Sequence, residues 1–365
     1  MNKNYYCIIM AGGIGSRFWP FSRQDKPKQF LDILHTGKTL IQKTYERFVK
    51  IIPKENILVV THNDYLQLVK DQLPEIQNQN ILLEPYRRNT APCIAYALSK
   101  IKMMNSDAVM VVAPSDHQII KEEDFLQNVM QGLDFVSKTD NLLTLGIKPS
   151  RPETGYGYIQ IENGKEYNKT ESNIFKKVKT FTEKPDFEMA KVFVESGEFF
   201  WNSGLFFWSA RSIENAFEQY LPDIYELFKN GETLWNTEFE SKFIEEIYSR
   251  CRNISIDYGI MEKASNAYMI ISDFGWSDLG TWGSLYEHLE KDENGNHIGC
   301  PNTFTYDSKN CIIKANQNKC VVVQGLEDYV IIDTNDVLLI CRTKEEQQIR
   351  QFVTDVKLKL GDKYI

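Results

Sequence analysis

The sequence has no long hydrophobic run and no cysteine pattern typical of a metal site. No apolar stretch approaches the roughly 18 residues that a membrane-spanning helix needs. The seven cysteines include no C-x-x-C pair, and the five histidines are scattered without the spacing of metal ligands. These absences argue against a membrane protein, a zinc site and a disulfide framework. A reducing cytoplasm is the setting we expect.

The sequence also lacks a secretory signal and the positive charge of a nucleic-acid-binding protein. The N-terminus lacks a long apolar region with a small-residue cleavage site, so we expect no secretory signal. The formal net charge of −8 argues against non-specific nucleic-acid binding, which needs a basic surface, but leaves room for a local basic pocket for phosphates. No low-complexity segment or long linker occurs, and the 25% of charged residues is ordinary for a globular protein of one or two domains.

What the sequence does contain is a glycine-rich stretch after its first apolar run. Residues 5–10 have the length of a buried strand, and they are followed by Ala11, Gly12, Gly13 and Gly15. Successive backbone N–H groups in such a loop form a cradle for anions. Cationic side chains then follow within a short distance: Arg17, Arg23, Lys26 and Lys28. This combination favours a polyphosphate ligand.

Other interpretations of this stretch are weaker. A dinucleotide fingerprint would need a third glycine where Phe18 stands, because close helix–strand packing leaves no room for a side chain there. A Walker A loop is excluded, since the only Gly-Lys-Thr, at residues 37–39, has Asp32 in place of the first glycine of the motif. A plain turn with solvated charges is the third alternative.

The segments G-G-x-G-x-R, W-P-x-S-R and P-K-Q-F, at residues 12–30, give the stretch a more specific identity. They resemble the signature of sugar-nucleotidyltransferases, and of the mannose-1-phosphate guanylyltransferases (GDP-mannose pyrophosphorylases) in particular. Chemistry gives Trp19-Pro20 no role, and we interpret the pair as packing that fixes the loop. Some relatives carry a further cupin-type isomerase domain; this chain of 365 residues is too short for one, so we expect no isomerase activity.

Strands and helices alternate along the first part of the chain. Further strands are predicted at residues 56–61, 80–83, 108–113 and 142–147, and helices at 40–49, 65–73, 90–104 and 125–136. Such alternation indicates a mostly parallel sheet with both faces covered. Together with the resemblance, it implies a Rossmann-like α/β nucleotidyltransferase domain with a mostly parallel (mixed) sheet. Ligands of these sheets bind at the carboxyl ends of the strands. The loops after the first, third and fourth strands are therefore expected to face one crevice.

The later part of the chain has a different pattern of apolar and glycine residues. Residues 151–208 predict shorter strands rich in glycine and aromatic residues, and residues 212–228 and 238–250 are expected to be helical. From about residue 302, short β-branched runs recur at intervals of seven to nine residues, which indicates a short β-helix or a small antiparallel sheet. An amphipathic helix at 344–360 is expected to cap these strands. We predict a catalytic domain at 1–295 and a β-rich, β-helix-like domain at 296–365.

Two aspartates follow apolar runs and are the candidate metal ligands. Asp116 lies in Pro-Ser-Asp-His after one strand, and Asp278 lies in Ser-Asp-Leu-Gly-Thr-Trp after another. Carboxylates at two strand ends can hold Mg²⁺ while substrate phosphates supply further oxygens. A single aspartate in this place is usually a turn or cap residue, but both segments match the family. His117 is expected to be a structural neighbour, since Mg²⁺ prefers oxygen.

The resemblance implies further site residues. Glu183-Lys184-Pro185 matches the family's E-K-P segment, which implies that Lys184 binds the sugar phosphate and Glu183 the hexose. Asn202 lies in the family's N-S-G segment, which lines the sugar pocket, and Gly157 would let the sugar approach the backbone. An exposed charge pair and bland turns are the alternatives for these segments.

Residues of the segment Glu84-Pro85-x-x-Arg88-Asn89-Thr90 are expected to meet the nucleotide. Guanine presents N–H donors on its pairing edge, so the Glu84 carboxylate or a nearby carbonyl is a candidate reader; an ion pair with Arg87 or Arg88 is the alternative. Asn89 and Thr90 are expected to cap the next helix as well. Ser115 completes the expected nucleotide contacts.

The predicted reaction is transfer of GMP from GTP to α-D-mannose 1-phosphate, giving GDP-mannose and pyrophosphate. The attacking phosphate monoester has a second pKa of about 6, so it is largely ionised and needs no general base. Arg17, Lys28 and Lys184 would position and stabilise charge, with Mg²⁺ on the two aspartates. The alternatives are another sugar-1-phosphate nucleotidyltransferase with a different hexose, heptose or base, a non-catalytic regulatory homologue and, more weakly, a Rossmann dehydrogenase. The oligomeric state stays open, with a homodimer as one option.

Overall fold

The computed structural model describes the chain except for residues 170–173, 183 and 232. The chain forms two compact units. Unit 1 consists of Met1–Gly12, Ile41–Ser115 and Ile119–Trp276; unit 2 consists of Gly13–Leu40, Asp116–Gln118 and Ser277–Ile365. Each unit has a hydrophobic core of its own. In the described part of the chain no helix has the length and apolarity needed to cross a membrane.

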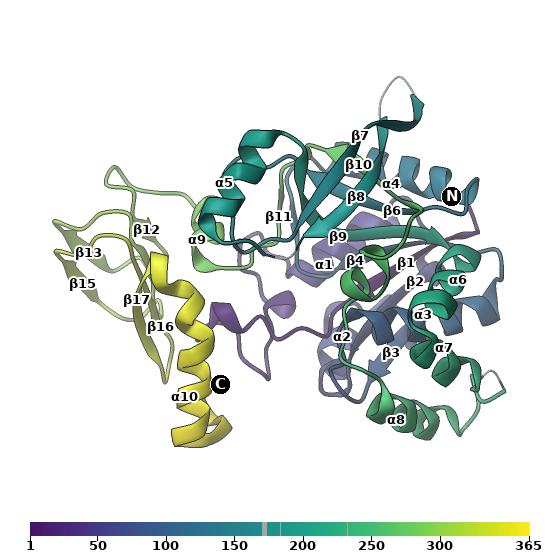
Figure 1. Cartoon of the computed structure of the whole chain (residues 1–365). Coiled ribbons are helices and arrows are strands. Elements are labelled where there is room, and N and C mark those ends of the chain that lie inside the picture. Colours follow the sequence, from purple (N-terminus) through teal and green to yellow (C-terminus); the bar gives the residue numbers. More distant parts are fainter. Residues whose placement is uncertain (170–173, 183, 232) are drawn as a thin grey trace. The chain divides into compact units, whose positions relative to one another are not determined.

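Unit 1 is built on a nine-stranded mixed sheet with the order β3-β2-β1-β4-β9-β6-β10-β8-β7 (Figure 1). Its strands are β1 (Tyr5–Met10), β2 (Ile57–His62), β3 (Ile81–Glu84), β4 (Val109–Pro114), β6 (Leu142–Ile147), β7 (Tyr158–Lys169), β8 (Ile174–Thr182), β9 (Phe199–Ser209) and β10 (Ala267–Ser272). The strands from β3 to β4 are parallel, whereas β9 is antiparallel to both its neighbours β4 and β6. The predicted α/β fold with a mixed sheet is confirmed.

Helices cover both faces of this sheet. They are α1 (Leu40–Val49), which begins at the last residue of a unit 2 segment, α2 (Leu66–Gln72), α3 (Thr90–Met104), α4 (Glu122–Ser137), α5 (Phe187–Ser196), α6 (Ala210–Tyr220), α7 (Pro222–Lys229) and α8 (Glu240–Arg250). Helix α3 packs against β1, β2 and β3, and α4 packs against β4, β6, β9 and β10. Because helices cover the strands, the side chains on both faces of a strand can be apolar. This explains the near-continuous hydrophobic runs of the sequence.

Two details of unit 1 differ from the sequence-based expectation. The helical stretch predicted at 212–228 is two helices, which meet at Leu221-Pro222 because proline lacks the N–H that would continue α6. The shorter strands predicted within 151–208 are wrong, since β7 and β9 have 12 and 11 residues. Gly204 suggested a turn, but it lies inside β9 with φ of +69°, where the register between β9 and β6 shifts.

The C-terminal part of unit 2 consists of two small sheets. One has the order β12 (His297–Ile298), β14 (Ile312–Lys314), β16 (Tyr329–Asp333) and β17 (Leu338–Arg342); the other pairs β13 (Thr303–Tyr306) with β15 (Val321–Gln324). All pairs are parallel except β16–β17. A small core cluster with side chains from both sheets contains Cys311, Ile313, Val323 and Ile331. The β-helix-like alternative is therefore confirmed over the antiparallel one.

The glycine-rich segment packs with this C-terminal part. The short helices η1 (Ser16–Phe18) and η2 (Lys28–Phe30) belong to unit 2 together with α9 (Trp282–Tyr286), η7 (Thr343–Gln348), α10 (Ile349–Leu360) and η8 (Gly361–Tyr364). One apolar cluster contains Phe18, Trp282 and Ile349. Helix α10 thus packs on strands, as predicted, and also on η1. The compact units cut the chain elsewhere than at residues 295/296, and the two-domain boundary stays a prediction.

Candidate functional site

In unit 1 the parallel strands bring their carboxyl ends to one edge of the sheet. Ala11 and Gly12 follow β1, Glu84 ends β3 and Ser115 follows β4. The Ala11 N–H donates to the Val60 carbonyl at 2.8 Å, and the Ser115 N–H donates to the Met10 carbonyl at 3.1 Å. Four of the predicted nucleotide-binding residues therefore lie along the edge where ligands of such sheets bind.

Glu84 is buried beneath the start of the glycine loop. Its Oε1 accepts a hydrogen bond of 3.1 Å from the hydroxyl of Tyr248 on α8, and a Cβ added to Gly12 would lie 3.0 Å from its Oε2. Gly12 is thus in close contact with the carboxyl group. The alternative ion pair is not found among the described residues: Arg87 donates to the Tyr65 hydroxyl and Arg88 to the Tyr248 carbonyl.

The burial of Glu84 changes its charge. Burial raises the pKa of Glu84 to about 8, although the Tyr248 hydroxyl and the Arg87 charge each act to lower it. At pH 7 this side chain is a neutral acid with one O–H donor, rather than the carboxylate that we expected. Its role as a reader of the base stays a prediction, but it would offer a ligand an O–H donor as well as acceptor oxygens.

Asn89 begins α3 in a strained backbone conformation. Its side-chain oxygen accepts from the Thr90 N–H at 2.9 Å, which is the capping role that the sequence predicts. Its backbone angles, φ of +69° and ψ of −168°, are a combination that residues other than glycine rarely adopt. Such strain is often found at ligand sites. The Thr90 hydroxyl accepts from the N–H of Ile256 at 2.8 Å and so fixes the segment before Asp257.

A pocket of about 360 Å³ in unit 1 contains four of the predicted residues. Asn89, Gly157, Lys184 and Asn202 all line it. Its wall also includes residues that the sequence analysis did not single out: Phe181, Thr182, Ser255, Asp257, Tyr258 and Glu262. We call this cavity the Asn202 pocket. The predicted hexose ligand Glu183 lies outside the described residues.

Asp257 holds the side chain of Asn202. The Asn202 Nδ2 donates to Asp257 Oδ1 at 2.6 Å, and its Oδ1 accepts from the Gly204 N–H at 3.0 Å. Both ends of the amide are thereby oriented. Asp257 begins a short π-helix, Asp257–Met261, a type of turn that is common at functional sites. The sequence carried no signal for it, because a single aspartate at a helix start is an ordinary N-terminal residue.

In unit 2 the ammonium group of Lys28 joins two of the loops that carry predicted site residues. Its Nζ lies 2.8 Å from Asp116 Oδ2 and donates at 2.5 Å to the backbone carbonyl of Asp278. Lys28 is 3% exposed, so these oxygens replace nearly all of its hydration. Only glycine at position 15, where φ is +70°, leaves room for the Lys28 side chain, because an added Cβ would lie 2.5 Å from the Lys28 Cβ, which is too close. We call Arg17, Lys28, Asp116 and Asp278 the Lys28 cluster.

The two aspartates of the cluster suit a hard cation. Burial acts to raise the pKa of Asp116, but the charges of Lys28 and His117 outweigh it and lower this pKa, so the carboxylate is ionised. Asp278 Oδ1 accepts from the Gly280 N–H at 2.7 Å. No group of three acidic, histidine or cysteine ligands occurs in the described part of the chain. Two carboxylates fit Mg²⁺, which commonly takes its other oxygens from water and phosphates.

Arg17 has an unsatisfied donor within the same unit. Its Nη1 makes a long bond of 3.4 Å to the Gly280 carbonyl, while its buried Nε has no partner among the residues that the structure describes. A half-buried guanidinium with a spare donor suits an anion. Burial and, second, the Arg17 charge lower the pKa of Arg350 on α10. Arg350 is thus a further cation of this region that the sequence motifs did not reveal.

Arg23 and Lys26, the remaining cations of the glycine-rich stretch, have other surroundings. Arg23 forms an ion pair with Asp336 and donates to the Thr334 hydroxyl at 3.1 Å. Lys26 is exposed. Of the four cations near the loop, Lys28 contacts both predicted metal ligands, and Arg17 contacts Gly280 in the segment that follows Asp278.

Comparisons with known proteins agree with the motifs. The chain matches a family model described as nucleotidyl transferase over residues 6–295. A second model, described as MannoseP isomerase/GMP-like beta-helix domain, matches residues 301–356.

Individual relatives match nearly the whole chain. An Escherichia coli protein named mannose-1-phosphate guanylyltransferase is 35% identical over 96% of this chain and 75% of its own length. The alginate biosynthesis protein AlgA of Pseudomonas putida is 36% identical over 95% of this chain and 70% of its own. A Thermus thermophilus crystal structure, described as mannose-1-phosphate geranyltransferase, is 28% identical, with a TM-score of 0.83 over 97% of this chain and 99% of that one.

The neutral state of Glu84 predicts a specific pH dependence of stability. The unfolded chain loses this proton near its ordinary pKa of 4.5, whereas the folded protein keeps it up to about 8. The contribution of Glu84 is therefore complete below pH 4.5 and is lost as the pH rises towards 8, by at most about 1.4 kcal/mol per pH unit. Glu84→Gln, which does not titrate, should gain in melting temperature relative to the wild type between pH 5 and pH 8. Exposed Glu238→Gln is the control, and equal pH profiles for the two variants would contradict a raised pKa.

Proposed function

Because the chain belongs to the mannose-1-phosphate guanylyltransferase family of nucleotidyl transferases, we propose that it transfers GMP from GTP to α-D-mannose 1-phosphate, with GDP-mannose and pyrophosphate as products. The observation that carries the proposal is the Lys28 cluster. One buried ammonium group is shared by the Asp116 carboxylate and the Asp278 loop. Phosphoryl chemistry needs such fixed charge in addition to positioning.

The cations of the cluster are assigned to the departing pyrophosphate. The buried, unpartnered Nε of Arg17 would donate to a phosphate oxygen, and the glycine-loop N–H groups would bind the α–β region. Lys28 would hold the β- and γ-phosphates, and Asp116 and Asp278 would hold Mg²⁺. The bound cation would supply charge neutralisation at the phosphates.

The sugar phosphate is assigned to the Asn202 pocket. Lys184 would hold the phosphate that attacks the α-phosphorus of GTP, and Gly157, Asn202 and Glu183 would contact the hexose. Support comes from the shared lining of this pocket by Gly157, Lys184 and Asn202. A phosphate monoester with a second pKa of about 6 is its own nucleophile, so no side chain needs to act as a general base.

The base and ribose are assigned to the strand ends of unit 1. Ala11, Gly12, Glu84 and Ser115 lie along one edge there, and Asn89 and Thr90 follow at the start of α3. The neutral Glu84 carboxyl has one donor and one acceptor, which matches the O6 and N1–H of guanine as a pair. Because either carboxyl oxygen can carry the proton, the reverse pattern of adenine would fit as well, so the choice of GTP rests on the family and not on Glu84.

The first prediction tests the reaction itself. Incubation of the protein with each nucleoside triphosphate and a set of sugar 1-phosphates, with Mg²⁺, should release pyrophosphate fastest with GTP and mannose 1-phosphate. A different preferred base or hexose would replace the proposed substrates with those of a related nucleotidyltransferase. No release with any pair would favour the non-catalytic homologue instead.

Asp278→Asn should lower kcat about 100-fold or more, because one of two metal-binding carboxylates loses its charge. The steady-state rate at saturating substrates and several Mg²⁺ concentrations measures this effect. Asp273→Asn, at a carboxylate that is 90% exposed, is the matched control and should retain full activity. Undiminished activity of Asp278→Asn would remove the metal assignment.

Lys184→Ala should raise the KM for the sugar phosphate about 10- to 100-fold, as expected for a lost hydrogen bond between charged groups. The KM for GTP should change much less. Initial rates with each substrate varied in turn separate the two constants, and Lys191→Ala on the exposed face of α5 is the control. The opposite pattern, with GTP affected and the sugar phosphate not, would mean that the two pockets are misassigned.

A further inference from the structure

The segment that carries Arg17 and Lys28 is held by the far end of the chain. Residues 13–40 belong to the same compact unit as residues 277–365, and they share one apolar cluster. We call residues 297–365, from β12 to the last residue, the C-terminal β domain. Phe18 contacts Trp282 with ring centroids 5.1 Å apart, and the cluster continues through Val330 of β16 to Ile349 of α10.

Trp19 is fixed by the last turn of the C-terminal β domain. Its indole Nε1 donates to the backbone carbonyl of Tyr364 at 2.7 Å, and the ring is buried. Buried indole groups usually find such a partner. The contact gives Trp19 a role that the chemistry of the motif did not provide: it ties the residue two positions after Arg17 to η8.

Arg23 attaches the same segment to the C-terminal β domain a second time, through a bidentate ion pair with Asp336. Its Nη1 donates to Asp336 Oδ2 at 2.8 Å, and its Nη2 binds both Asp336 Oδ1 and the Thr334 hydroxyl. The Arg23 Nε donates to the carbonyl of Pro20 at 3.2 Å, so the guanidinium also braces its own loop. A bidentate arginine–carboxylate pair fixes orientation as well as distance.

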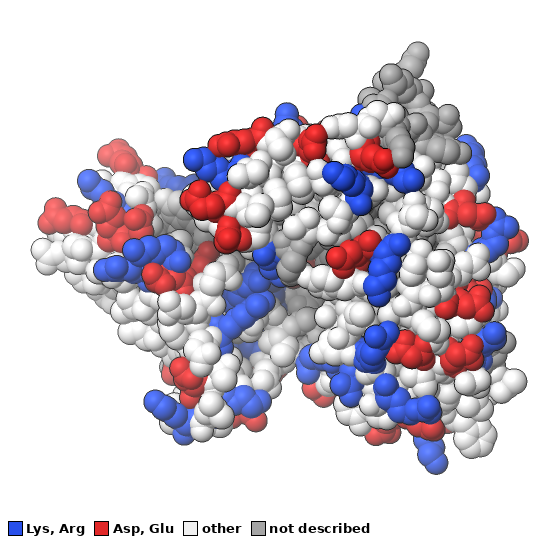
Figure 2. Space-filling model, in the orientation of Figure 1, with Lys and Arg blue, Asp and Glu red and all other residues white. Residues whose placement is uncertain are grey.

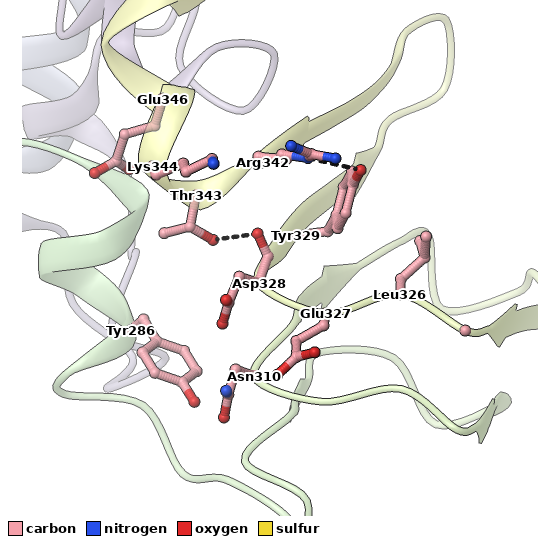
Figure 3. Close-up of a pocket in the computed structure, with 11 residues that line it drawn as sticks. Tyr286, Asn310, Leu326, Glu327, Asp328, Tyr329, Arg342, Thr343, Lys344 and Glu346 are labelled. Atoms are coloured by element: carbon pink, nitrogen blue, oxygen red, sulfur yellow. Dashed lines mark hydrogen bonds between the residues drawn. The ribbon is translucent and has the colours of Figure 1, made fainter.

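The Asp278 loop is attached to the same domain. Gly283, on α9 just after this loop, donates its N–H to Glu346 Oε2 of η7 at 2.8 Å. Glu346 and Thr343 lie in the wall of a cavity of about 920 Å³ within unit 2, and Figure 3 shows the Thr343 hydroxyl donating to the Asp328 carbonyl in that wall. The cavity is lined by none of the predicted site residues. Its wall reaches α9 through the hydrogen bond between Glu346 and Gly283.

We propose that the C-terminal β domain is a positioning element of the transfer reaction, in which Asp336 and Glu346 hold the Arg17–Lys28 loop and the Asp278 loop in their working geometry. The proposal rests on the assigned role of the Lys28 cluster. Neither acid touches substrate. They act through loops whose misplacement by about 1 Å can cost about 100-fold in rate.

The test combines two variants that remove the attachments with one that restores the first. Asp336→Asn and Glu346→Ala should each lower kcat about tenfold and raise the KM for the nucleoside triphosphate, with the KM for the sugar phosphate within twofold of the wild-type value. The double variant Arg23→Asp with Asp336→Arg should recover part of the loss. A purely structural pair would not give this split between substrates.

The control is an ion pair of the same domain whose lysine is exposed. Lys319 binds Asp333 at 2.8 Å on the C-terminal strands, and Lys319→Gln should leave kcat and both KM values unchanged. Melting temperatures are measured for every variant. Activity losses that follow the melting temperature and affect both substrates equally would overturn the proposal, as would wild-type kinetics in both Asp336→Asn and Glu346→Ala.

Failure of the proposed function gives a different result. If the wild-type protein released no pyrophosphate with any substrate pair, the assigned reaction would be wrong. If the wild-type protein were active with another base or sugar, the same variants would be compared with that pair. A wild-type enzyme whose kinetics are indifferent to both acids would contradict the positioning role alone.

Discussion

The arrangement of unit 2 depends on the buried ammonium group of Lys28. An ammonium ion removed from water is costly by several kcal/mol unless oxygens replace its hydration. Here the Asp116 carboxylate and the Asp278 carbonyl do so, and the two loops are thereby joined to the glycine-rich segment although Lys28 and Asp278 are 250 residues apart. Removal of any one member would leave an uncompensated group in a closed space. The geometry of the cluster is therefore a joint property of three distant segments.

Two candidate functional acids, one in each unit, have opposite protonation states for a simple reason. Asp116 is half-buried beside Lys28 and His117, whose charges lower its pKa. Glu84 is buried against a tyrosine hydroxyl and apolar atoms, and its pKa rises to about 8. The fixed negative charge thus lies in unit 2, where a cation is expected, and the neutral donor lies in unit 1, where a base is expected. Residue type alone did not distinguish these cases, because the partner of each acid decides its charge.

The sequence predicted those features that depend on neighbouring residues. The period of apolar runs predicted the parallel strands and helices, and the loops after the strands indicated the edge where ligands of such sheets bind. Features that depend on distant partners were not predictable in this way. Asp257 orients Asn202 from 55 residues away, and the Arg23–Asp336 pair spans 313 residues. From its residue type and its place near the glycine loop, Arg23 was a candidate phosphate ligand. Its ion pair with Asp336 shows that it has another role.

A loop as rich in glycine as residues 12–15 needs support from other parts of the chain. Each backbone residue that is fixed costs about 1–2 kcal/mol of conformational entropy, and glycine loses more freedom than other residues. A loop free to move would lose the preorganisation that phosphate chemistry requires, since there is little covalent work for side chains to do. Gly12 to Gly15 cannot supply rigidity of their own. The indole of Trp19 and the guanidinium of Arg23, fixed by η8 and by Asp336, supply it from either side of Pro20. Under the proposed function, the β-helix-like end of the chain therefore supports the loop that binds the phosphates.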